Sequence, residues 1–263
     1  MKPIIKWAGG KSQILPLLIE RLPENFNRYF EPFAGGLALA LALGKEEIFI
    51  SDVSSEVINL YECVAQNPDR VLAELADFAT TEKDYYRIRS MDKEPGFANM
   101  DVFKKAARFL YLNKNGYNGL WRVNKDGFNN VPRGRYSCIH YGVENVREVG
   151  RYLGAHAHIE KCSFEQTTIH ARENDFVYFD PPYHNTFTNY NAQGFNEEMQ
   201  RRLKAEVDRL TQLNVKVMLS NNDDIFIREL YADYNIVGIN AKRYLNSDGN
   251  NRTDGREVIV TNY

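Results

Sequence analysis

The alternation of short apolar strands with helical segments constrains this sequence more than any other feature. Over the first sixty residues, strands are predicted at 29–33 and 48–51, and helices follow Gly10, cover 37–43 and begin again at Ser54. One face of this last helix is apolar and is formed by Val57, Leu60, Tyr61 and Val64. Because parallel strands need a long crossover, usually a helix, this alternation predicts a parallel sheet and an α/β fold.

The strand pattern returns in the C-terminal part of the chain. Three strands are predicted near 158–162, 176–179 and 215–219, and a helix over 197–213 lies between the last two. Two more strands, near 234–240 and 257–261, flank the polar segment 243–256 and are expected to pair as an antiparallel hairpin at the sheet edge. The sheet is therefore expected to be mixed, with helices on both faces.

The middle of the chain follows a different pattern. Residues 63–150 read as helices followed by a polar loop region at 113–136, with no convincing pair of strands. We interpret this part as a mostly helical insert. The predicted domains are residues 1–62 together with 151–263, which form the sheet, and residues 63–150, which form the insert.

The formal net charge of −2 hides a strongly basic stretch within the insert. Between Lys104 and Arg135, eight basic residues stand against the single acid Asp126, which gives +7 there and leaves −9 for the rest of the chain. Aromatic residues, Asn and Gly are interleaved with these cations, as in surfaces that contact nucleic acid through phosphates, base edges and stacking. On composition alone, a solvated helix face followed by a polar loop is the slightly favoured explanation.

Cysteine usage and hydropathy exclude several classes of protein. Cys63, Cys138 and Cys162 form no close pair, so neither a disulfide framework nor a four-thiolate zinc site is expected. This cysteine usage favours a protein of the reducing cytosol. The longest strongly apolar run, 37–43, is far shorter than the ~20 residues that cross a bilayer. The N-terminal residues also lack the apolar core of a signal peptide. We therefore expect a cytoplasmic protein with no membrane association.

The first candidate site is the segment 30–37, FEPFAGGL, in which a strand runs into two glycines and then a helix. Glycines at the carboxyl end of a parallel strand let the backbone approach a cofactor closely. Asp52 ends the next predicted strand, where an acid can bind both hydroxyls of a ribose. The pair predicts a nucleoside-containing cofactor, although a glycine turn that only packs a helix stays open, because the dinucleotide fingerprint is absent.

The second candidate site is the segment 175–183, DFVYFDPPY, an apolar strand that ends in Asp-Pro-Pro-Tyr. Two prolines fix the backbone and hold the neighbouring carbonyls and side chains stiffly. An acid, a rigid carbonyl and an aromatic ring together suit a planar base with an amino group, which would donate to the two acceptors while stacking on the ring. A plain turn with a packed tyrosine is the alternative.

The third candidate site is the segment 6–11, KWAGGK, just before a predicted helix. A lysine near a helix N-terminus is unfavourable for the helix dipole, so Lys11 indicates a bound anion. The phosphate-loop spacing is not met, and a loop with a surface lysine remains open.

Together, these three segments and the insert segment 112–122, LNKNGYNGLWR, resemble the Dam-type family of DNA adenine methyltransferases, in the order of its alpha class. The resemblance spans nearly the whole chain. It implies a Rossmann-like methyltransferase sheet interrupted by a target-recognition insert. One departure is visible, because the family often has a third glycine where this chain has Leu37.

The resemblance implies S-adenosyl-L-methionine as the methyl donor and S-adenosyl-L-homocysteine as the product, with no metal. Lys11 would meet the carboxylate of the donor, Asp52 its ribose and Phe164 its adenine, although core packing stays open for Phe164. The full set of implied donor-binding residues is Trp7, Lys11, Phe33, Gly35, Asp52, Phe164 and Asp180. We interpret His156 and His158, which are expected to share a strand face, as structural residues.

The acceptor implied by the resemblance is an adenine that is flipped out of double-stranded DNA, because its amino group is unreachable in the stacked helix. The implied catalytic residues are Asp180, Pro181, Pro182 and Tyr183. The implied DNA contacts are Lys6, Tyr117, Asn118, Leu120, Arg122, Pro132 and Arg135, of which Arg135 would meet phosphate. The expected target is GATC, and no obligate protein partner is expected. The segment 246–256 is a candidate to order over the DNA, and a disordered surface loop is an equally open alternative for it.

Other functions share parts of this pattern. A cytosine amino group could be the acceptor in DNA, and a DNA-binding regulator could use the same scaffold without activity. A nicotinamide oxidoreductase would need a dinucleotide loop that is missing. Methylation of a protein glutamine or of RNA leaves the +7 insert unexplained.

Overall fold

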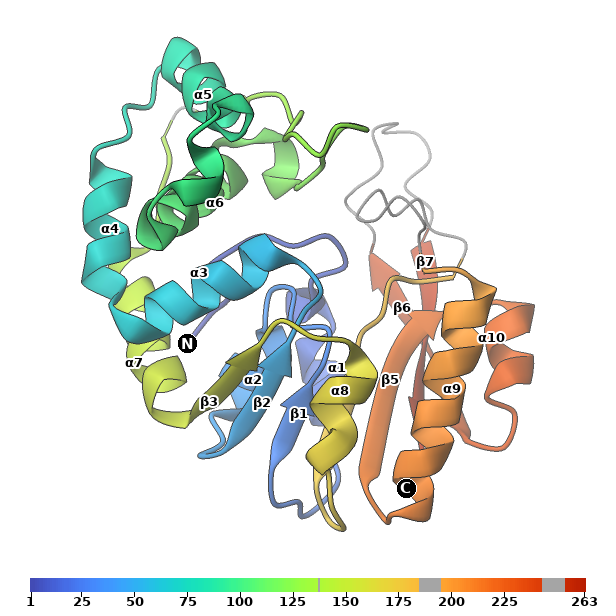
Figure 1. Cartoon of the computed structure of the whole chain (residues 1–263). Helices are drawn as coiled ribbons and strands as arrows, with labels where there is room; N and C mark the ends of the chain where they lie inside the picture. The colour runs from blue at the N-terminus through green and yellow to red at the C-terminus, as the bar shows by residue number, and fades with distance from the viewer. Residues whose placement is uncertain (137, 185–194, 243–253) are drawn as a thin grey trace.

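The computed structural model describes residues 1–136, 138–184, 195–242 and 254–263. Its centre is a seven-stranded sheet with the order β3-β2-β1-β4-β5-β7-β6 (Figure 1). The strands β1 to β5 are parallel, whereas β7 runs antiparallel to both β5 and β6. This confirms the mixed sheet and the hairpin at its edge. The strands are β1 (Tyr29–Glu31), β2 (Ile48–Ser51), β3 (Ala157–Glu160), β4 (Phe176–Phe179), β5 (Lys216–Asn222), β6 (Asn235–Lys242) and β7 (Asp254–Thr261).

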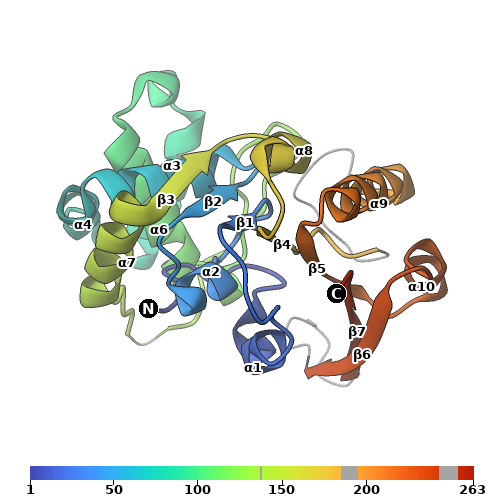
Figure 2. The same cartoon turned by 90° about the horizontal axis from the view of Figure 1, so that it is seen from below.

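Helices cover both faces of the sheet, as expected. Seen from below in Figure 2, α8 and α9 lie on one face and α1 and α2 on the other. The α-helices are α1 (Leu15–Ile19), α2 (Ala38–Leu43), α3 (Ser55–Gln66), α4 (Pro68–Ala76), α5 (Glu82–Arg89), α6 (Val102–Asn115), α7 (Val143–His156), α8 (Phe164–Thr167), α9 (Glu197–Gln212) and α10 (Ile225–Leu230). The short 3-10 helices are η1 (Lys11–Gln13), η2 (Ser90–Lys93), η3 (Phe97–Asn99), η4 (Tyr117–Gly119) and η5 (Thr168–His170).

Local sequence explains where the longer helices begin. The side chains of Ser54, Asp101 and Asn196 each accept a hydrogen bond from the first turn of α3, α6 and α9. Such caps satisfy backbone N–H groups that have no partner inside the helix. Pro68 occupies the first turn of α4, where its missing N–H costs nothing.

The sheet separates two apolar cores, because neighbouring residues of a strand point to opposite faces. On β4, Phe176 and Tyr178 join one core, which also contains the buried faces of α3, α6 and α7. Val177 and Phe179 join the other core, which is packed against α9. All four residues of β4 are buried, as expected for a central strand.

The insert is helical, as predicted. Its helices α4, α5 and α6 stand above the sheet in Figure 1, and its strand pairing is confined in the described residues to two isolated bridges, Gly116 with Arg133 and Val123 with Asn129. The predicted domain boundaries at residues 62/63 and 150/151 fall inside α3 and α7, so both helices run through the proposed division. That division stays a prediction.

One local prediction was wrong. His156 is the last residue of α7, whereas His158 lies in β3, so the two histidines do not share a strand face. The helix continues because its apolar face extends to the buried Leu153. In the described part of the chain, no helix is long and apolar enough to cross a membrane.

Candidate active site

The order of the strands brings the first two candidate motifs together. The chain runs outward from β1 to β2 and β3, and then returns to place β4 on the other side of β1. The carboxyl ends of β1 and β4 are therefore neighbours at the point where the strand order reverses. In open α/β sheets this is where ligands bind.

An ion pair joins the third motif to the second. The Nζ of Lys11, in η1, lies 2.6 Å from Oδ1 of Asp180, directly after β4. The side chains of Lys11 and Asp180 are only 6% and 19% exposed. Burial raises the pKa of Asp180 to about 6, and the neighbouring Lys11 ammonium limits this rise. Asp180 is therefore a shielded carboxylate that is ionised above about pH 6.

Tyr183 completes this cluster. Its ring centroid lies 4.8 Å from the Lys11 Nζ, and its hydroxyl donates a hydrogen bond of 2.8 Å to Oε2 of Glu257, on β7. Burial, followed by the charges of Asp180 and Glu257, holds the pKa of Tyr183 well above its ordinary value. Tyr183 is therefore a neutral phenol whose ring is fixed at both its face and its hydroxyl.

A second buried acid lies beneath the cluster. Glu31, the last residue of β1, accepts hydrogen bonds on Oε2 from the Tyr29 hydroxyl at 2.7 Å and from the Ala40 N–H at 3.1 Å. Burial raises the pKa of Glu31 to about 8 although these bonds oppose the rise. At neutral pH Glu31 is predominantly a neutral acid.

The glycine turn after β1 is tied to the end of β2. Asp52 accepts hydrogen bonds from the Gly35 N–H at 3.1 Å and from the Ser54 N–H at 2.8 Å. Burial raises the pKa of Asp52, and these backbone bonds oppose the rise. At Gly35, φ is +42° and an added Cβ would lie 2.6 Å from Cδ1 of Trp7. The turn therefore requires glycine at this position, and it places Trp7 against the backbone that follows β1.

Leu37, the departure from the family pattern, adopts a conformation that glycine would tolerate better. Its φ and ψ are 56° and 33°, in the left-handed region, and it precedes the first residue of α2. Its side chain is 1% exposed. Leucine is kept in this strained conformation because its side chain fills the core.

Two of the three aromatic residues assigned to the donor, Phe33 and Phe164, lie in one cluster. Phe33 and Phe164 stack with ring centroids 5.6 Å apart, and both pack against Phe179 and Phe195. Phe164 is 3% exposed, while Phe33 is partly exposed. The core packing that was left open for Phe164 is therefore present.

The predicted DNA contacts gather around one turn of the insert. The side chain of Asn113 accepts a hydrogen bond from the Lys6 N–H at 2.8 Å and donates to the carbonyls of Lys6 and Gly119 at 2.7 and 3.0 Å. This holds Lys6 against the turn that contains three predicted contacts. Tyr117, Asn118, Arg122, Pro132 and Arg135 are exposed, and Leu120 is partly exposed.

Three cations of this region have defined surroundings. The guanidinium of Arg122 is held by Asn130, whose Oδ1 accepts from Nε at 2.7 Å. Lys6 and Lys114 line a cavity of about 120 Å³, and burial together with the Lys6 charge lowers the pKa of Lys114.

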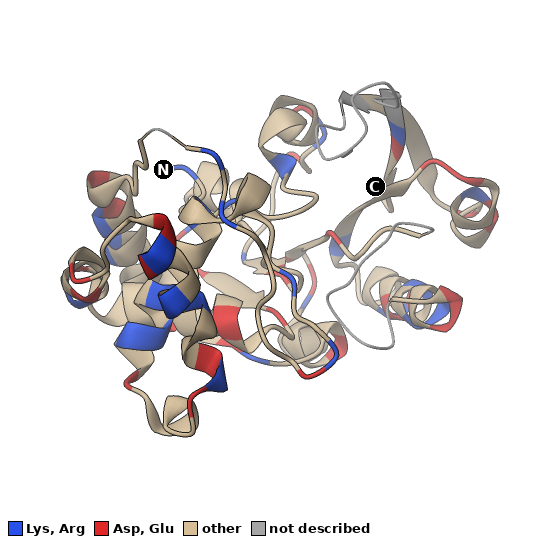
Figure 3. Ribbon diagram, turned by 90° about the horizontal axis from the view of Figure 1, so that it is seen from above, with Lys and Arg blue, Asp and Glu red and all other residues tan. Residues whose placement is uncertain are grey.

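The basic stretch is less uniformly exposed than its composition indicates. Arg108 is 2% exposed, forms an ion pair with Asp92 at 2.9 Å and donates to the carbonyls of Ile88 and Arg89. It therefore holds the insert together rather than contributing to a contact surface. Figure 3 shows basic and acidic residues mixed along the helices of the insert. Of the predicted DNA-covering segment 246–256, residues 246–253 lie outside the described residues.

Sequence reasoning missed the partners that fix the site. Glu257 was expected only as the first residue of a strand, and Glu31 only as part of a motif. An acid within an otherwise apolar strand was the available signal for both. In the described ranges, no group of three or more His, Cys, Asp or Glu side chains is arranged to hold a metal ion.

Comparison with known proteins identifies the family to which this sequence is similar. Residues 7–245 match the family model of the D12 class N6 adenine-specific DNA methyltransferases. The type II methyltransferase M1.LlaDCHI of Lactococcus lactis subsp. cremoris is 38% identical, over 100% of this chain and 96% of that protein. The type II methyltransferase M.MjaIII of Methanocaldococcus jannaschii is 36% identical, over 100% and 99%. The DNA adenine methylase of Escherichia coli K12 is 29% identical, over 98% and 94%.

Proposed function

Because the chain belongs to the D12 class N6 adenine-specific DNA methyltransferase family, we propose that it methylates the 6-amino group of an adenine flipped out of double-stranded DNA, within the sequence GATC. Family membership makes the chain an adenine-specific DNA methyltransferase. The observation that carries the finer proposal is the Lys11, Asp180 and Tyr183 cluster at the end of β4, beside the glycine turn that follows β1.

The cluster suits an aromatic amine as the acceptor. Such an amine is a poor nucleophile, because its lone pair is delocalised into the ring. Asp180 and the Pro181 carbonyl are the proposed acceptors for its two N–H groups, and a pyramidal nitrogen held in this way has a more localised lone pair. Stacking on Tyr183 would offset the few kcal/mol that base flipping costs. The Pro181-Pro182 pair keeps these groups in place before the base arrives, which is how orientation lowers a barrier.

The residues around the glycine turn fit S-adenosyl-L-methionine. When bound, the donor would supply a methyl group from a positively charged sulfur. It would become S-adenosyl-L-homocysteine, and the methylated amine would release one proton. The Asp180 carboxylate, kept ionised above about pH 6 with the help of Lys11, provides a shielded negative charge for such a cation. Asp52 would bind the ribose of the donor, and Trp7 and Lys11 would bind its methionine end. Phe164 would contact the adenine, and Phe33 and Gly35 would line the rest of the donor site.

Recognition of DNA is assigned to the turn that Asn113 holds against Lys6. Tyr117, Asn118 and Leu120 would contact or wedge between bases, and Arg122 would read a guanine, whose two major-groove acceptors fit a guanidinium fork. Pro132 would also contact bases or wedge into the duplex, Lys6 would reach a base from the sheet domain, and Arg135 would meet phosphate. Because the helices of the insert carry mixed charges, we assign the contact with DNA to this turn and its neighbours and not to the whole insert. The same proposal places the enzyme in the cytoplasm, with DNA as its partner.

Nucleoside analysis tests the proposal. Purified protein is incubated with labelled S-adenosyl-L-methionine and two DNA duplexes that differ only in GATC and GTAC, and the DNA is digested to nucleosides. We expect N6-methyldeoxyadenosine from the GATC duplex only. N4-methyldeoxycytidine would refute the acceptor, equal labelling of both duplexes would refute the target, and no product from either would support a regulator without activity. A 2-aminopurine in place of the target adenine should brighten on binding, and constant fluorescence would contradict flipping.

A further inference from the structure

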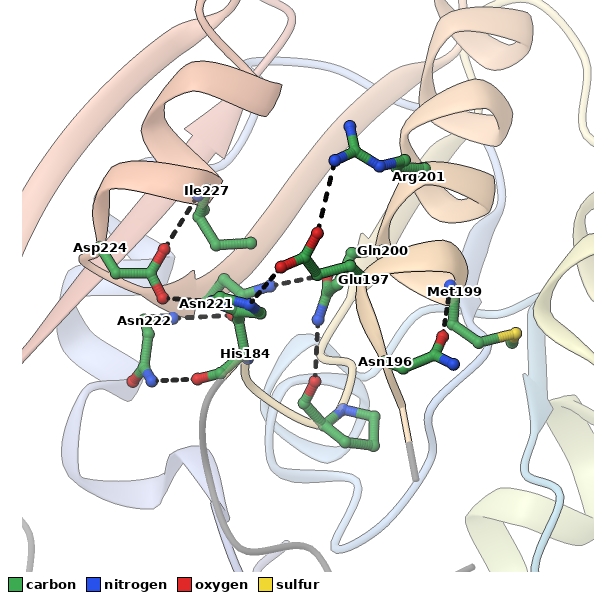
Figure 4. Close-up of polar contacts among 11 residues, drawn as sticks. His184, Asn196, Glu197, Met199, Gln200, Arg201, Asn221, Asn222, Asp224 and Ile227 are labelled. Atoms are coloured by element: carbon green, nitrogen blue, oxygen red, sulfur yellow. Dashed lines mark hydrogen bonds and ion pairs between the residues drawn. The ribbon is translucent and has the colours of Figure 1, made fainter. Parts of the chain in front are cut away.

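A bridge of two side-chain amides holds the backbone on both sides of Tyr183 (Figure 4). Nε2 of Gln200, on α9, donates a hydrogen bond of 3.1 Å to the Pro182 carbonyl. Oε1 of the same side chain accepts one of 3.1 Å from Nδ2 of Asn221, on β5. Oδ1 of Asn221 in turn accepts one of 3.1 Å from the His184 N–H. The bridge therefore joins the carbonyl before Tyr183 to the N–H after it.

The chemistry at the two ends determines how both amides are oriented. A backbone carbonyl can only accept and a backbone N–H can only donate, so Gln200 must turn its NH₂ group to Pro182 and Asn221 must turn its oxygen to His184. The contact between the two amides is then a donor facing an acceptor. Asn221 also accepts from the Asn222 N–H at 2.8 Å, which favours the same orientation.

The bridge is buried and rigid. Gln200 and Asn221 are both 0% exposed, so an unpaired polar atom in either would be costly. The segment is further held where it leaves the bridge, because Nδ1 of His184 lies 2.6 Å from Oδ2 of Asp224 and the Asn222 side chain donates to the His184 carbonyl. Asp224 is itself fixed as the N-terminal cap of α10.

We infer that Gln200 and Asn221 are positioning residues for methyl transfer, which set the direction of the Pro181–Pro182 carbonyls and of the Tyr183 ring before the base binds. This inference rests on the proposed role of the Asp180 to Tyr183 segment as the acceptor site. The Glu257 contact fixes the end of the Tyr183 side chain, and the amide bridge fixes its backbone.

Gln200→Glu tests the inference, because it keeps the size of the side chain and changes its hydrogen bonding. An ionised glutamate cannot donate to the Pro182 carbonyl and would repel it, whereas a protonated glutamic acid can donate its O–H there and still accept from Asn221. In Asn221→Asp, an ionised aspartate likewise cannot donate to Oε1 of Gln200, whereas a protonated aspartic acid can. Single-turnover transfer rates are measured from pH 5.5 to 8.5 on GATC duplex and divided by the wild-type rate at each pH. The temperature lies below every unfolding midpoint.

We expect the rate ratio to fall about 100-fold at pH 8.5, the size of effect that an ångström of misplacement causes, and to recover at least tenfold at pH 5.5. Affinity for DNA and for the methyl donor should change less than threefold. Gln212→Glu places the same charge on an exposed part of α9, and Leu203→Ala removes a buried apolar group from that helix. Both controls should keep a rate ratio near one at every pH.

Rates of both variants within twofold of wild type, or a ratio that does not change with pH, would overturn the inference. Unfolding of both variants at pH 8.5, recorded by near-ultraviolet circular dichroism, would overturn it as well, since it would assign the bridge to stability. These outcomes differ from failure of the proposed function, in which the wild-type protein itself yields no N6-methyldeoxyadenosine.

Discussion

Replacing Lys11 with methionine removes the cation that keeps Asp180 ionised. The two charged groups are 2.6 Å apart and largely shielded from water. For charges about 4 Å apart near a protein surface the attraction is about 4 kcal/mol, and each pKa unit corresponds to about 1.4 kcal/mol. The pKa of Asp180, about 6 in the wild-type protein, should therefore rise by roughly 2 to 3 in Lys11→Met.

The sign of the resulting pH dependence follows from the proposed role. Asp180 must be ionised to accept hydrogen bonds and to face a cation, so activity should be present above its pKa and lost as the pH falls through it. The assay is kcat/KM for the methyl donor as a function of pH, because this parameter reports ionisations of the free enzyme. Wild-type activity should decline below about pH 6, and that of Lys11→Met should already decline below about pH 8.

Two further variants separate charge from other effects. Lys11→Met also removes a predicted contact to the donor, so its overall activity does not test the electrostatic reasoning. The test is the acid limb of the profile, that is, the pH below which activity declines. Lys11→Arg keeps the charge and should keep the limb near that of the wild type. Lys45→Met, before β2 at the opposite end of the strands, should leave it unchanged. An acid limb at the same pH in Lys11→Met and wild type would refute the electrostatic reasoning.

Substitutions at Glu31, Leu37 and Arg122 test three further predictions. Glu31 keeps its proton in the folded protein up to about pH 8 but loses it near pH 4.5 in the unfolded chain. The free energy of unfolding of the wild-type protein should therefore fall by up to about 5 kcal/mol as the pH rises through this window. Glu31→Gln should remove that slope in chemical denaturation curves, and parallel slopes would contradict the assignment. At Leu37, with its positive φ, Leu37→Gly should be about 1 kcal/mol more stable than Leu37→Ala, whereas Leu41→Gly within α2 should be about 1 kcal/mol less stable than Leu41→Ala. The same order at both positions would show that Leu37 is not strained. Arg122→Ala should relax base choice at one pair by about 1–3 kcal/mol in methylation of single-substitution duplexes, and equal losses on every duplex would assign Arg122 to phosphate instead.

The sequence predicted most of the sheet because strand positions depend on local apolar patterns. The strand at 48–51 was placed to the residue, and β6 and β7 form the hairpin that was predicted at a sheet edge. The prediction that His156 and His158 share a strand face was wrong, because a helix end that no capping signal marks lies between them. Leu37 could be noticed as a departure, but its left-handed backbone follows from the core that its side chain fills.

The contacts that organise the site could not be predicted in the same way. Lys11 meets Asp180, and Tyr183 meets Glu257, across long stretches of chain and through strands that are brought together only by the sheet order. Arg108 looked like a surface cation, and only the fold shows its partner Asp92. Gln200 and Asn221 carried no motif, since a buried amide is recognised by its partners and not by its sequence neighbours.

The most direct test of the central claim is the single-turnover rate of methyl transfer by Asp180→Asn on a GATC duplex, with DNA affinity measured in parallel. Asparagine keeps the shape of the side chain but turns one acceptor into a donor and removes the negative charge. We expect a rate at least about 1000-fold below wild type, in the range of losing about 4 kcal/mol of transition-state stabilisation, with DNA affinity within a few-fold. A rate within tenfold of wild type would contradict the claim that Asp180 holds the reacting amine.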